Sequence, residues 1–392
     1  MNVTFTPQIS HTETHQRGPP ASMILQLSRF FSYLTSLNRY DAEWNIYTDA
    51  IDAAFNASGL QIKYQGATFC CRTPWFAYLP TFIANNKQRL RSISVHDYAQ
   101  GPGDLATLVT SGIYPGKAQL DGYANATAAG IEYQMGETGS VSQGGSANVS
   151  DVFAGGALWG IDWLFNGVAL GYKGMNFQAI GSSAPYSPWN VGTPPDIRPL
   201  YYALLAFART IAGPNAYLLN TNTMQGSNKK ISLSFNSTQP QVSVWSTLDL
   251  ESGVRKVIVN HRNITGNTPD AQVTVSFSTT GGIYPNAILY FLEAPSPYSK
   301  TGVTLAGQTF DGSADGTIQG PLTTFTLPMV AINNNNNDGN VTDTWQFTMH
   351  PSSTAFLTIC PADNSIPCGG ISSSSASGVR ASKFVKWFLS LW

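Results

Sequence analysis

A change in hydrophobic pattern near Pro214 divides the chain and constrains its fold more than any other feature. Between residues 38 and 213, runs of helical spacing alternate with short strand-like runs, about four times. This order is typical of parallel β/α units. After Pro214 the chain consists of short alternating runs such as KISLSF, QVSVW and TAFLTIC, separated by Gly, Pro, Asn and Ser. These runs predict an all-β domain, most simply a β-sandwich.

The elements of the first half are expected from spacing and from helix start and stop signals. A helix is expected before Gly59, because Trp44, Tyr47, Ile51, Ala54 and Phe55 recur at helical spacing. Further helices are expected at 76–86, from a Ser150 cap to Asn166-Gly167, and from Pro199 to Gly213. Strands are expected at 59–69, 90–98, 131–137 and 173–180.

Four segments follow from this pattern. Residues 1–37 show no hydrophobic period. They are expected to be a weakly structured or non-homologous N-terminal segment. The β/α region spans 38–213 and the β-sandwich domain 214–365, which agrees with a prior of roughly 100–200 residues per domain. Residues 366–392 form a Ser-rich linker and an apolar tail too short to span a membrane.

Composition excludes some classes of function. Charged residues make up only 11% of the 392 residues, the net charge is −1, and no basic stripe occurs, so a nucleic-acid partner is excluded. A surface rich in Ser, Thr, Asn and Gly suits a secreted glycoprotein, and seven Asn-X-Ser/Thr sequons give this weak support. The N-terminus has no signal-peptide pattern, and no segment predicts a membrane span. Oligomeric state is not indicated.

The four cysteines do not have zinc spacing. Cys360 and Cys368 flank a short polar loop and are a disulfide candidate, whereas Cys70 and Cys71 are expected as small apolar groups at a strand end. Four free thiols are the alternative. No metal site is expected.

The segment Gly136-Glu137-Thr138-Gly139 places a carboxylate at the end of a strand-like run. Ile131, Tyr133 and Met135 share one face of that strand, and Glu137 falls on the same parity. Glutamate is rarely buried unless it is paired or functional. Glu137 is therefore a candidate functional residue; the structural alternative is a cap for the polar loop that follows.

Other polar side chains follow neighbouring strands. In barrels of parallel β/α units, function gathers at the C-terminal ends of the strands. This rule selects His96 and Tyr98 after one strand, Gln178 after another, and Tyr186 and Trp189 in the next loop. Together with Glu137 they suggest a sugar site, because aromatic faces stack on sugar rings and a carboxylate stabilises an oxocarbenium-like carbon.

Each of these residues has a structural alternative. His96 could lie in the core, Tyr98 could cap the core, and Trp189 could pack within its loop. Glu132 is expected to face the helices or to pair with Lys or Arg. Trp159 and Trp163, four residues apart on a helix, are expected in the core.

The stretch YQMGETGSVSQGGSANVSDVFAGGALWGIDWLF resembles the nucleophile segment of glycoside hydrolase family 79, the β-glucuronidase and heparanase-like family, in its fungal form. SVHDY is similar to that family's histidine–tyrosine strand end, and GMNFQ…YSPW to its last barrel strand and loop. The resemblance covers roughly residues 38–362.

That resemblance implies the C-terminal half of a (β/α)8 TIM-type barrel followed by the β-domain. It implies a retaining mechanism with Glu137 as nucleophile and no metal or organic cofactor. His96 and Tyr98 would orient Glu137 or touch the sugar. The sugar-acid subsite would include Gln178, Tyr186, Trp189 and the backbone amides of the loop that contains Ser140 and Gly144. The resemblance also implies secretion and a uronic-acid-containing glycan as the partner.

The sequence departs from the family at the general acid. The family's acid/base glutamate lies in an Asn-Glu-Pro motif that is missing here, along with the first four strand–helix units. No acid/base residue is found, and a truncated chain is expected to be impaired or inactive, because general acid help is worth roughly 10²–10⁴-fold.

Three functions remain open. The first is a retaining β-glucuronidase-type hydrolase. The second is a non-catalytic carbohydrate-binding remnant of the same family. The third is a neutral-sugar hydrolase, because no Arg or Lys is clearly placed to hold a uronate.

Overall fold

The computed structural model describes the greater part of the chain from residue 37 to residue 359. The described residues are 37–70, 73–179, 184–192, 195–211, 216–219, 241–249, 254–265, 269–280, 285–313, 315–333 and 340–359. The expectations for residues 1–36, the KISLSF run, the Cys360–Cys368 disulfide and the C-terminal tail lie outside them.

The chain forms two compact units. The first contains Met1–Asp97, Gly116–Glu137 and Tyr172–Met175, and the second contains Tyr98–Pro115, Thr138–Gly171 and Asn176–Trp392. Helices of the first unit are α2 (Leu37–Asn56), α3 (Thr73–Asn86) and α5 (Lys117–Ala128). A sheet of order β1-β2-β3-β4 begins in this unit, with β1 (Tyr64–Cys70), β2 (Leu90–Gln100), β3 (Glu132–Val141) and β4 (Met175–Phe177). Strands β1 and β2 are parallel, as the β/α pattern predicted.

The helix predicted before Gly59 is present, but its buried side differs from the expected one. Tyr47 is 70% exposed and Ile51 is also exposed, whereas Tyr40 and Trp44 contact the sheet side. A Cβ on Gly66 of β1 would lie 2.6 Å from the Trp44 ring, so the glycine provides the space that this ring occupies. Packing on β1 therefore decides which side of α2 is buried.

Helices of the second unit are α4 (Leu105–Thr110), α6 (Trp159–Leu170) and α7 (Pro199–Thr210), and a π-helical turn, Ala154–Leu158, precedes α6. The prediction that Ser150 caps this helix is wrong, because the helical turn begins at Ala154 and the Ser150 hydroxyl instead accepts from the Ser146 amide at 3.1 Å. The prediction that Asn166-Gly167 ends it is also wrong, since the helix continues to Leu170.

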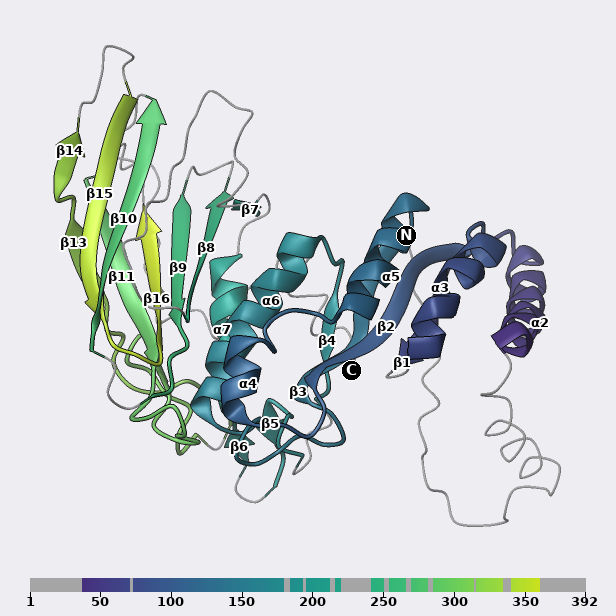
Figure 1. Ribbon diagram of the computed structural model, residues 1–392, viewed down its shortest axis with the longest axis horizontal. Helices are drawn as coiled ribbons and strands as arrows, with labels where there is room; N and C mark the ends of the chain where they lie inside the picture. Colours follow the sequence, from purple (N-terminus) through teal and green to yellow (C-terminus); the bar gives the residue numbers. More distant parts are fainter. Residues whose placement is uncertain are drawn as a thin grey trace. The chain divides into compact units, whose positions relative to one another are not determined.

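Antiparallel sheets make up the C-terminal part of the second unit, as predicted (Figure 1). The larger sheet has the order β12-β11-β16-β9-β8-β7 with β13 paired to β11, and the smaller has the order β10-β15-β14. Their bounds are β7 (Ala216–Leu219), β8 (Val242–Asp249), β9 (Arg255–His261), β10 (Ala271–Thr280), β11 (Asn286–Glu293), β12 (Thr304–Leu305), β13 (Phe325–Pro328), β14 (Ala331–Asn333), β15 (Asn340–Met349) and β16 (Ser353–Ile359). A short pair, β5 (Trp189–Asn190) and β6 (Asp196–Ile197), precedes α7.

One apolar cluster joins the two antiparallel sheets. It includes Val257 and Val259 of β9, Val273 of β10, Trp345 of β15 and Leu357 of β16, all nearly inaccessible to solvent. Strands β9 and β16 do not alternate between buried and exposed residues, because nearly every position in both is buried.

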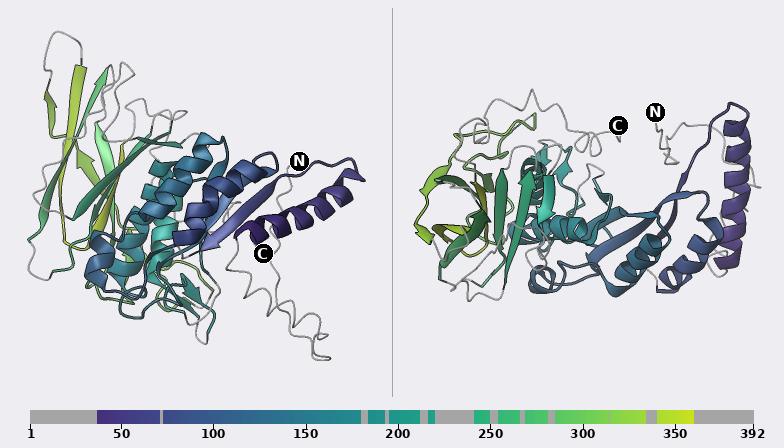
Figure 2. Two further views of the ribbon diagram at one scale, coloured as in Figure 1. Left: turned by 45° about the vertical axis from the view of Figure 1, so that its right-hand side comes forward. Right: turned by 90° about the horizontal axis from the view of Figure 1, so that it is seen from above.

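Helices α6 and α7 cover the β8–β9 side of the larger sheet (Figure 2). The Phe165 ring of α6 stacks on Trp245 of β8 with centroids 5.5 Å apart. The carboxylate of Asp162, fully buried, pairs with the Arg262 guanidinium and accepts from the Trp245 indole nitrogen at 2.7 Å. The Asp162 carboxylate, held by an ion pair and two hydrogen bonds, fixes the helix on the sheet.

The state of the cysteines differs in part from the expectation. Cys70, at the end of β1, is disulfide-bonded, so its assignment as a small apolar thiol is wrong. Within the described part of the chain, no helix has the length and apolar character needed to cross a membrane.

Candidate functional site

Adjacent strands bring Glu137 and His96 together. The Glu137 Oε2 atom lies 3.5 Å from the His96 Nδ1 atom, and the two side chains are 30% and 23% exposed, respectively. Glu137 lies in β3 and His96 in β2, which are neighbours in the sheet. A half-buried carboxylate beside an imidazole can be held in one orientation and remain open to a ligand.

A glycine on each side of the Glu137-Thr138 pair makes room for neighbouring side chains. A Cβ on Gly136 would lie 2.0 Å from the Ser94 Oγ atom of β2. A Cβ on Gly139 would lie 2.9 Å from the Tyr98 ring. Both spacings are too short for any larger residue, so close packing explains the small residues on either side of the carboxylate.

The side chains of β3 do not keep one alternation along the strand. The Tyr133 hydroxyl donates to a carbonyl oxygen of α5 at 3.1 Å, and the Thr138 hydroxyl accepts from an indole of α6 at 2.9 Å, so residues of opposite parity both face helices. Gly136 and Glu137, although consecutive, both meet side chains of β2. The alternation therefore shifts by one residue at this point.

Two predictions about Glu137 are corrected by this geometry. Glu137 does not continue the face that carries Tyr133, because the Tyr133 hydroxyl contacts α5 whereas the Glu137 carboxylate lies beside His96 of β2. The strand also does not end at Glu137 but continues to Val141.

Helix α6 anchors the residue that follows Glu137. The Trp163 indole nitrogen donates to the Thr138 hydroxyl at 2.9 Å, and both side chains are inaccessible to solvent. The Trp163 ring stacks on Trp159 with centroids 5.3 Å apart. The prediction that both tryptophans lie in the core is confirmed.

Asp97 and Glu132 have structural contacts. Asp97 is 7% exposed and accepts from the Gln119 carboxamide at 2.7 Å. Burial, together with the charges of Tyr172 and Asp97, raises the pKa of Tyr133, so the Tyr133 hydroxyl remains a donor. The carboxylate of Glu132 lies 3.4 Å from Arg91, which confirms that Glu132 pairs with a basic residue.

The second unit places Tyr98 beside Tyr186, with ring centroids 5.9 Å apart. Gly145, at a φ of +84°, would bring a Cβ within 2.7 Å of the Tyr186 amide nitrogen, so the glycine loop packs closely under this residue. Gly144 has a φ of +96° and open space where a Cβ would be, and Ser140 is buried.

Gln178 and Trp189 are placed differently from each other. The backbone amide of Gln178 donates to the Thr138 backbone carbonyl at 3.1 Å, which ties the end of β4 to β3. The Trp189 ring packs edge-on against Tyr201 of α7, with centroids 6.3 Å apart. Trp189 therefore packs against a helix and not within its own loop.

Arg198 holds the loop that carries Tyr186 and Trp189, although no sequence pattern selects this residue. Its side chain is 7% exposed, with the Nε atom 3.4 Å from Asp151 and 3.6 Å from Asp196. The guanidinium also donates to the Ala184 carbonyl, and the backbone amide of Arg198 to the Pro188 carbonyl at 2.9 Å. Burial raises the pKa of Asp151, and Arg198 opposes this rise.

No group of three or more His, Cys, Asp or Glu side chains in the described ranges has the arrangement of a metal site.

Comparison with known proteins supports the fold. No family model and no curated protein matches the sequence. Among solved structures, the chain matches the 4-O-α-L-rhamnosyl-β-D-glucuronidase of Fusarium oxysporum 12S in complex with Rha-GlcA, with a TM-score of 0.58 and 21% identity over 81% of this chain. At this level of identity the likeness is one of fold. The match covers 64% of the Fusarium enzyme, so this chain spans less than two thirds of it.

Two further glycoside hydrolases match at lower TM-scores. The family 51 arabinofuranosidase AbfB of Bifidobacterium longum matches with a TM-score of 0.45 and 14% identity, covering 83% of this chain and 64% of that one. The family 51 arabinofuranosidase of Xanthomonas axonopodis pv. citri matches with a TM-score of 0.43 and 10% identity, covering 72% and 56%.

Proposed function

We propose that this chain carries the nucleophile half of a retaining glycoside hydrolase site, with Glu137 as the nucleophile. The observation that carries the proposal is the half-exposed carboxylate 3.5 Å from His96, on neighbouring strands of a fold shared with a glucuronidase. In a retaining enzyme such a carboxylate attacks the anomeric carbon and forms a covalent glycosyl ester. His96 orients the attacking oxygen, and Tyr98 extends the same strand two residues further.

The substrate class in this proposal is a β-glucuronide within a glycan. Support comes from the resemblance of the segment around Glu137 to glycoside hydrolase family 79 and from the Fusarium enzyme, whose structure holds Rha-GlcA. Gln178, Tyr186 and the loop with Ser140 and Gly144 would contribute to the sugar-acid subsite. The same reading makes the protein a secreted glycoprotein.

The β/α part would be the last units of a (β/α)8 barrel over 38–213, followed by a β-sandwich over 214–365. The parallel pairing of β1 with β2 and the exposed apolar side chains of α2 support this reading, because a complete barrel would cover such a helix on both sides. The segments 1–37 and 366–392 would lie outside both domains.

Hydrolysis of ordinary glycosides by this chain alone is expected to be impaired. Retaining hydrolysis needs a second carboxyl group about 5–5.5 Å from the nucleophile to protonate the leaving group. Glu43 and Glu132 are each engaged by an arginine, Arg39 at 3.3 Å and Arg91 at 3.4 Å. This engagement favours the second candidate function, a non-catalytic carbohydrate-binding remnant.

A covalent label separates the two candidates. In 2-deoxy-2-fluoro-β-D-glucuronyl fluoride the leaving fluoride needs no general acid. Attack by a Glu137 oxygen forms a bond to the anomeric carbon while the carbon–fluorine bond breaks and fluoride departs with the electron pair. We expect one equivalent of glycosyl adduct on the peptide that contains Glu137, measured by mass spectrometry of the full chain.

Glu132→Gln is the matched control, because Glu132 lies in the same strand but is paired with Arg91. This variant should label like the wild type, and Glu137→Gln should not label. Saturable binding of glucuronide oligosaccharides without any adduct would support the binding remnant. An adduct that persists in Glu137→Gln would refute the assignment of the nucleophile.

A further inference from the structure

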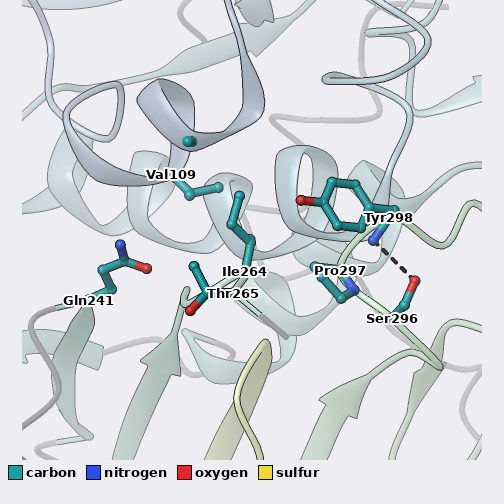
Figure 3. A pocket seen from close by; sticks show the side chains of 8 residues that line it. Val109, Gln241, Ile264, Thr265, Ser296, Pro297 and Tyr298 are labelled. Carbon is teal, nitrogen blue, oxygen red and sulfur yellow. Dashed lines mark hydrogen bonds between the residues drawn. The ribbon is translucent and has the colours of Figure 1, made fainter. Parts of the chain in front are cut away.

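A cavity of about 630 Å³ lies within the second unit and does not involve Glu137 (Figure 3). The cavity is lined by Val109 of α4, Gln241 just before β8, Ile264 and Thr265 after β9, and the Pro297-Tyr298 segment. Its volume is in the range of ligand sites, which are mainly apolar with a few placed polar groups. The eight lining residues include no charged side chain.

Gln241 presents an unsatisfied acceptor in this cavity. Its Oε1 atom is buried and has no hydrogen-bond partner, and Figure 3 shows this oxygen turned toward Thr265. A buried acceptor without a donor costs free energy, and a native protein seldom retains one without a reason. A ligand hydroxyl inside the cavity would supply the missing donor.

Tyr298 offers an aromatic surface in the same cavity. The side chain is 57% exposed, and its hydroxyl end is directed toward Ile264 in Figure 3. The segment is rigidly held, because the Pro297 carbonyl accepts from the Ala154 amide at 2.9 Å and the Tyr298 amide donates to Ser296 Oγ at 3.2 Å. An exposed ring on a fixed loop can stack on the flat face of a sugar without losing conformational freedom.

Arg262 holds two parts of the cavity wall in place. Its guanidinium donates to the Val109 carbonyl and pairs with Asp162, and its backbone amide donates to the Gln241 carbonyl at 2.9 Å. Both parts are therefore tied to one buried residue. A site formed in advance binds its ligand at a lower entropic cost.

A second cavity of about 500 Å³ adjoins the first. The two share Ile264, Thr265, Ser296 and Pro297, and the second adds Glu293, His350 and the hydroxyl groups of Ser352 and Ser353. Two adjacent cavities with polar groups in both suit a chain of sugar units better than a single compact ligand.

From these features we propose that the cavity around Gln241 and Tyr298 binds a neutral oligosaccharide, separately from the Glu137 site. A pyranose ring would stack on Tyr298, and one of its hydroxyl groups would donate to Gln241 Oε1. Pyranoses with equatorial hydroxyl groups fit best, because their faces carry only axial hydrogens. The eight residues that line the first cavity include no charged side chain, so a uronate carboxylate would have no cationic partner there, and in the second cavity it would meet the Glu293 carboxylate.

Calorimetric titration of the full chain tests the proposal. Cellohexaose, xylohexaose and mannohexaose serve as neutral probes, and hexagalacturonate serves as the charged comparison. The protein is expressed in a bacterial host, because this keeps the sequon at Asn263, next to Ile264, free of glycan. We expect saturable binding of at least one neutral hexaose and none of hexagalacturonate. Tyr298→Ala should weaken binding about tenfold, equal to 1.4 kcal/mol, and Gln241→Met about fivefold.

Two controls make the result specific. Tyr217→Ala removes an equally accessible tyrosine, 55% exposed on β7, and should leave binding unchanged. Glu137→Gln should also leave it unchanged, so this proposal can fail or succeed independently of the nucleophile assignment. Absence of saturable binding for all three neutral probes, binding that is indifferent to Tyr298→Ala and Gln241→Met, or binding lost in Glu137→Gln would each overturn it.

Discussion

Replacement of Gly136 by alanine should destabilise the strand that carries Glu137, and the cost can be derived from its surroundings. The new Cβ would lie 2.0 Å from Ser94 Oγ and 3.4 Å from Ser94 Cβ. Ser94 is 1% exposed, so its hydroxyl has no solvent to move into. Overpacking of this kind usually costs about 1–3 kcal/mol, and we expect about 2 kcal/mol from urea unfolding.

A second substitution isolates the cause. Ser94→Ala removes the oxygen that the new methyl group meets, while the remaining 3.4 Å separation is an ordinary contact. The double variant should therefore recover most of the lost stability, with a coupling free energy of about 1–2 kcal/mol in the cycle. Gly101→Ala is the matched control, because nothing lies within 4 Å of a Cβ there.

The same double-mutant cycle should apply to the rate at which Glu137 is labelled. Gly136→Ala displaces the backbone next to Glu137 and should slow labelling by the fluoroglucuronyl fluoride, and Ser94→Ala should restore the rate in the double variant. If Gly136→Ala is as stable as Gly101→Ala, or if Ser94→Ala does not restore the stability of Gly136→Ala, then Gly136 of β3 does not pack closely on Ser94 of β2.

Three further predictions concern the second unit. Asp162→Asn leaves the buried Arg262 charge uncompensated and should cost about 3–5 kcal/mol in thermal unfolding, whereas Asp162→Leu with Arg262→Met should recover most of it. Burial lowers the pKa of Lys256 to about 8, so between pH 8 and about 10 the unfolded state binds more protons and wild-type stability should rise with pH, a rise that Lys256→Met should lack. Trp163→Phe removes the donor to Thr138 and should cost about 1 kcal/mol in urea unfolding and slow the labelling.

The sequence predicted those elements whose signals are local. Pro199 at the first turn and the apolar spacing after it define α7, and the alternating runs after Pro214 correspond to antiparallel strands. Helix ends were less predictable, because tertiary contacts override local signals. The Asn166 carboxamide donates to the Ile113 carbonyl at 2.7 Å, which keeps Asn-Gly within α6 and moves its end to Gly171, at a φ of +85°.

The candidate site was predictable only in part. Glu137 and His96 could be selected because each is a polar residue late in a strand-like run, and parallel strands bring such residues to one edge. The shift in alternation within β3 could not be predicted, because it depends on where Ser94 meets Gly136 across two strands. Arg198 was missed for a similar reason, since its partner Asp151 is distant in sequence.

The dependence of the glycosylation rate on the leaving group shows whether Glu137 acts with or without a general acid. A nucleophile that acts without a general acid can expel only leaving groups that are stable as anions, so its glycosylation rate should fall steeply as the pKa of the departing alcohol rises. If a second carboxyl group reaches the site, the rate for poor leaving groups should be higher by roughly 10²–10⁴-fold and the dependence shallow. A series of aryl glucuronides with increasing phenol pKa, measured before and after Glu137→Gln, therefore distinguishes a lone nucleophile from a complete pair of carboxylates. A glycosylation rate that hardly depends on the phenol pKa and that Glu137→Gln abolishes would mean that the general acid is present. A rate that falls steeply as the phenol pKa rises would mean that the acid is missing.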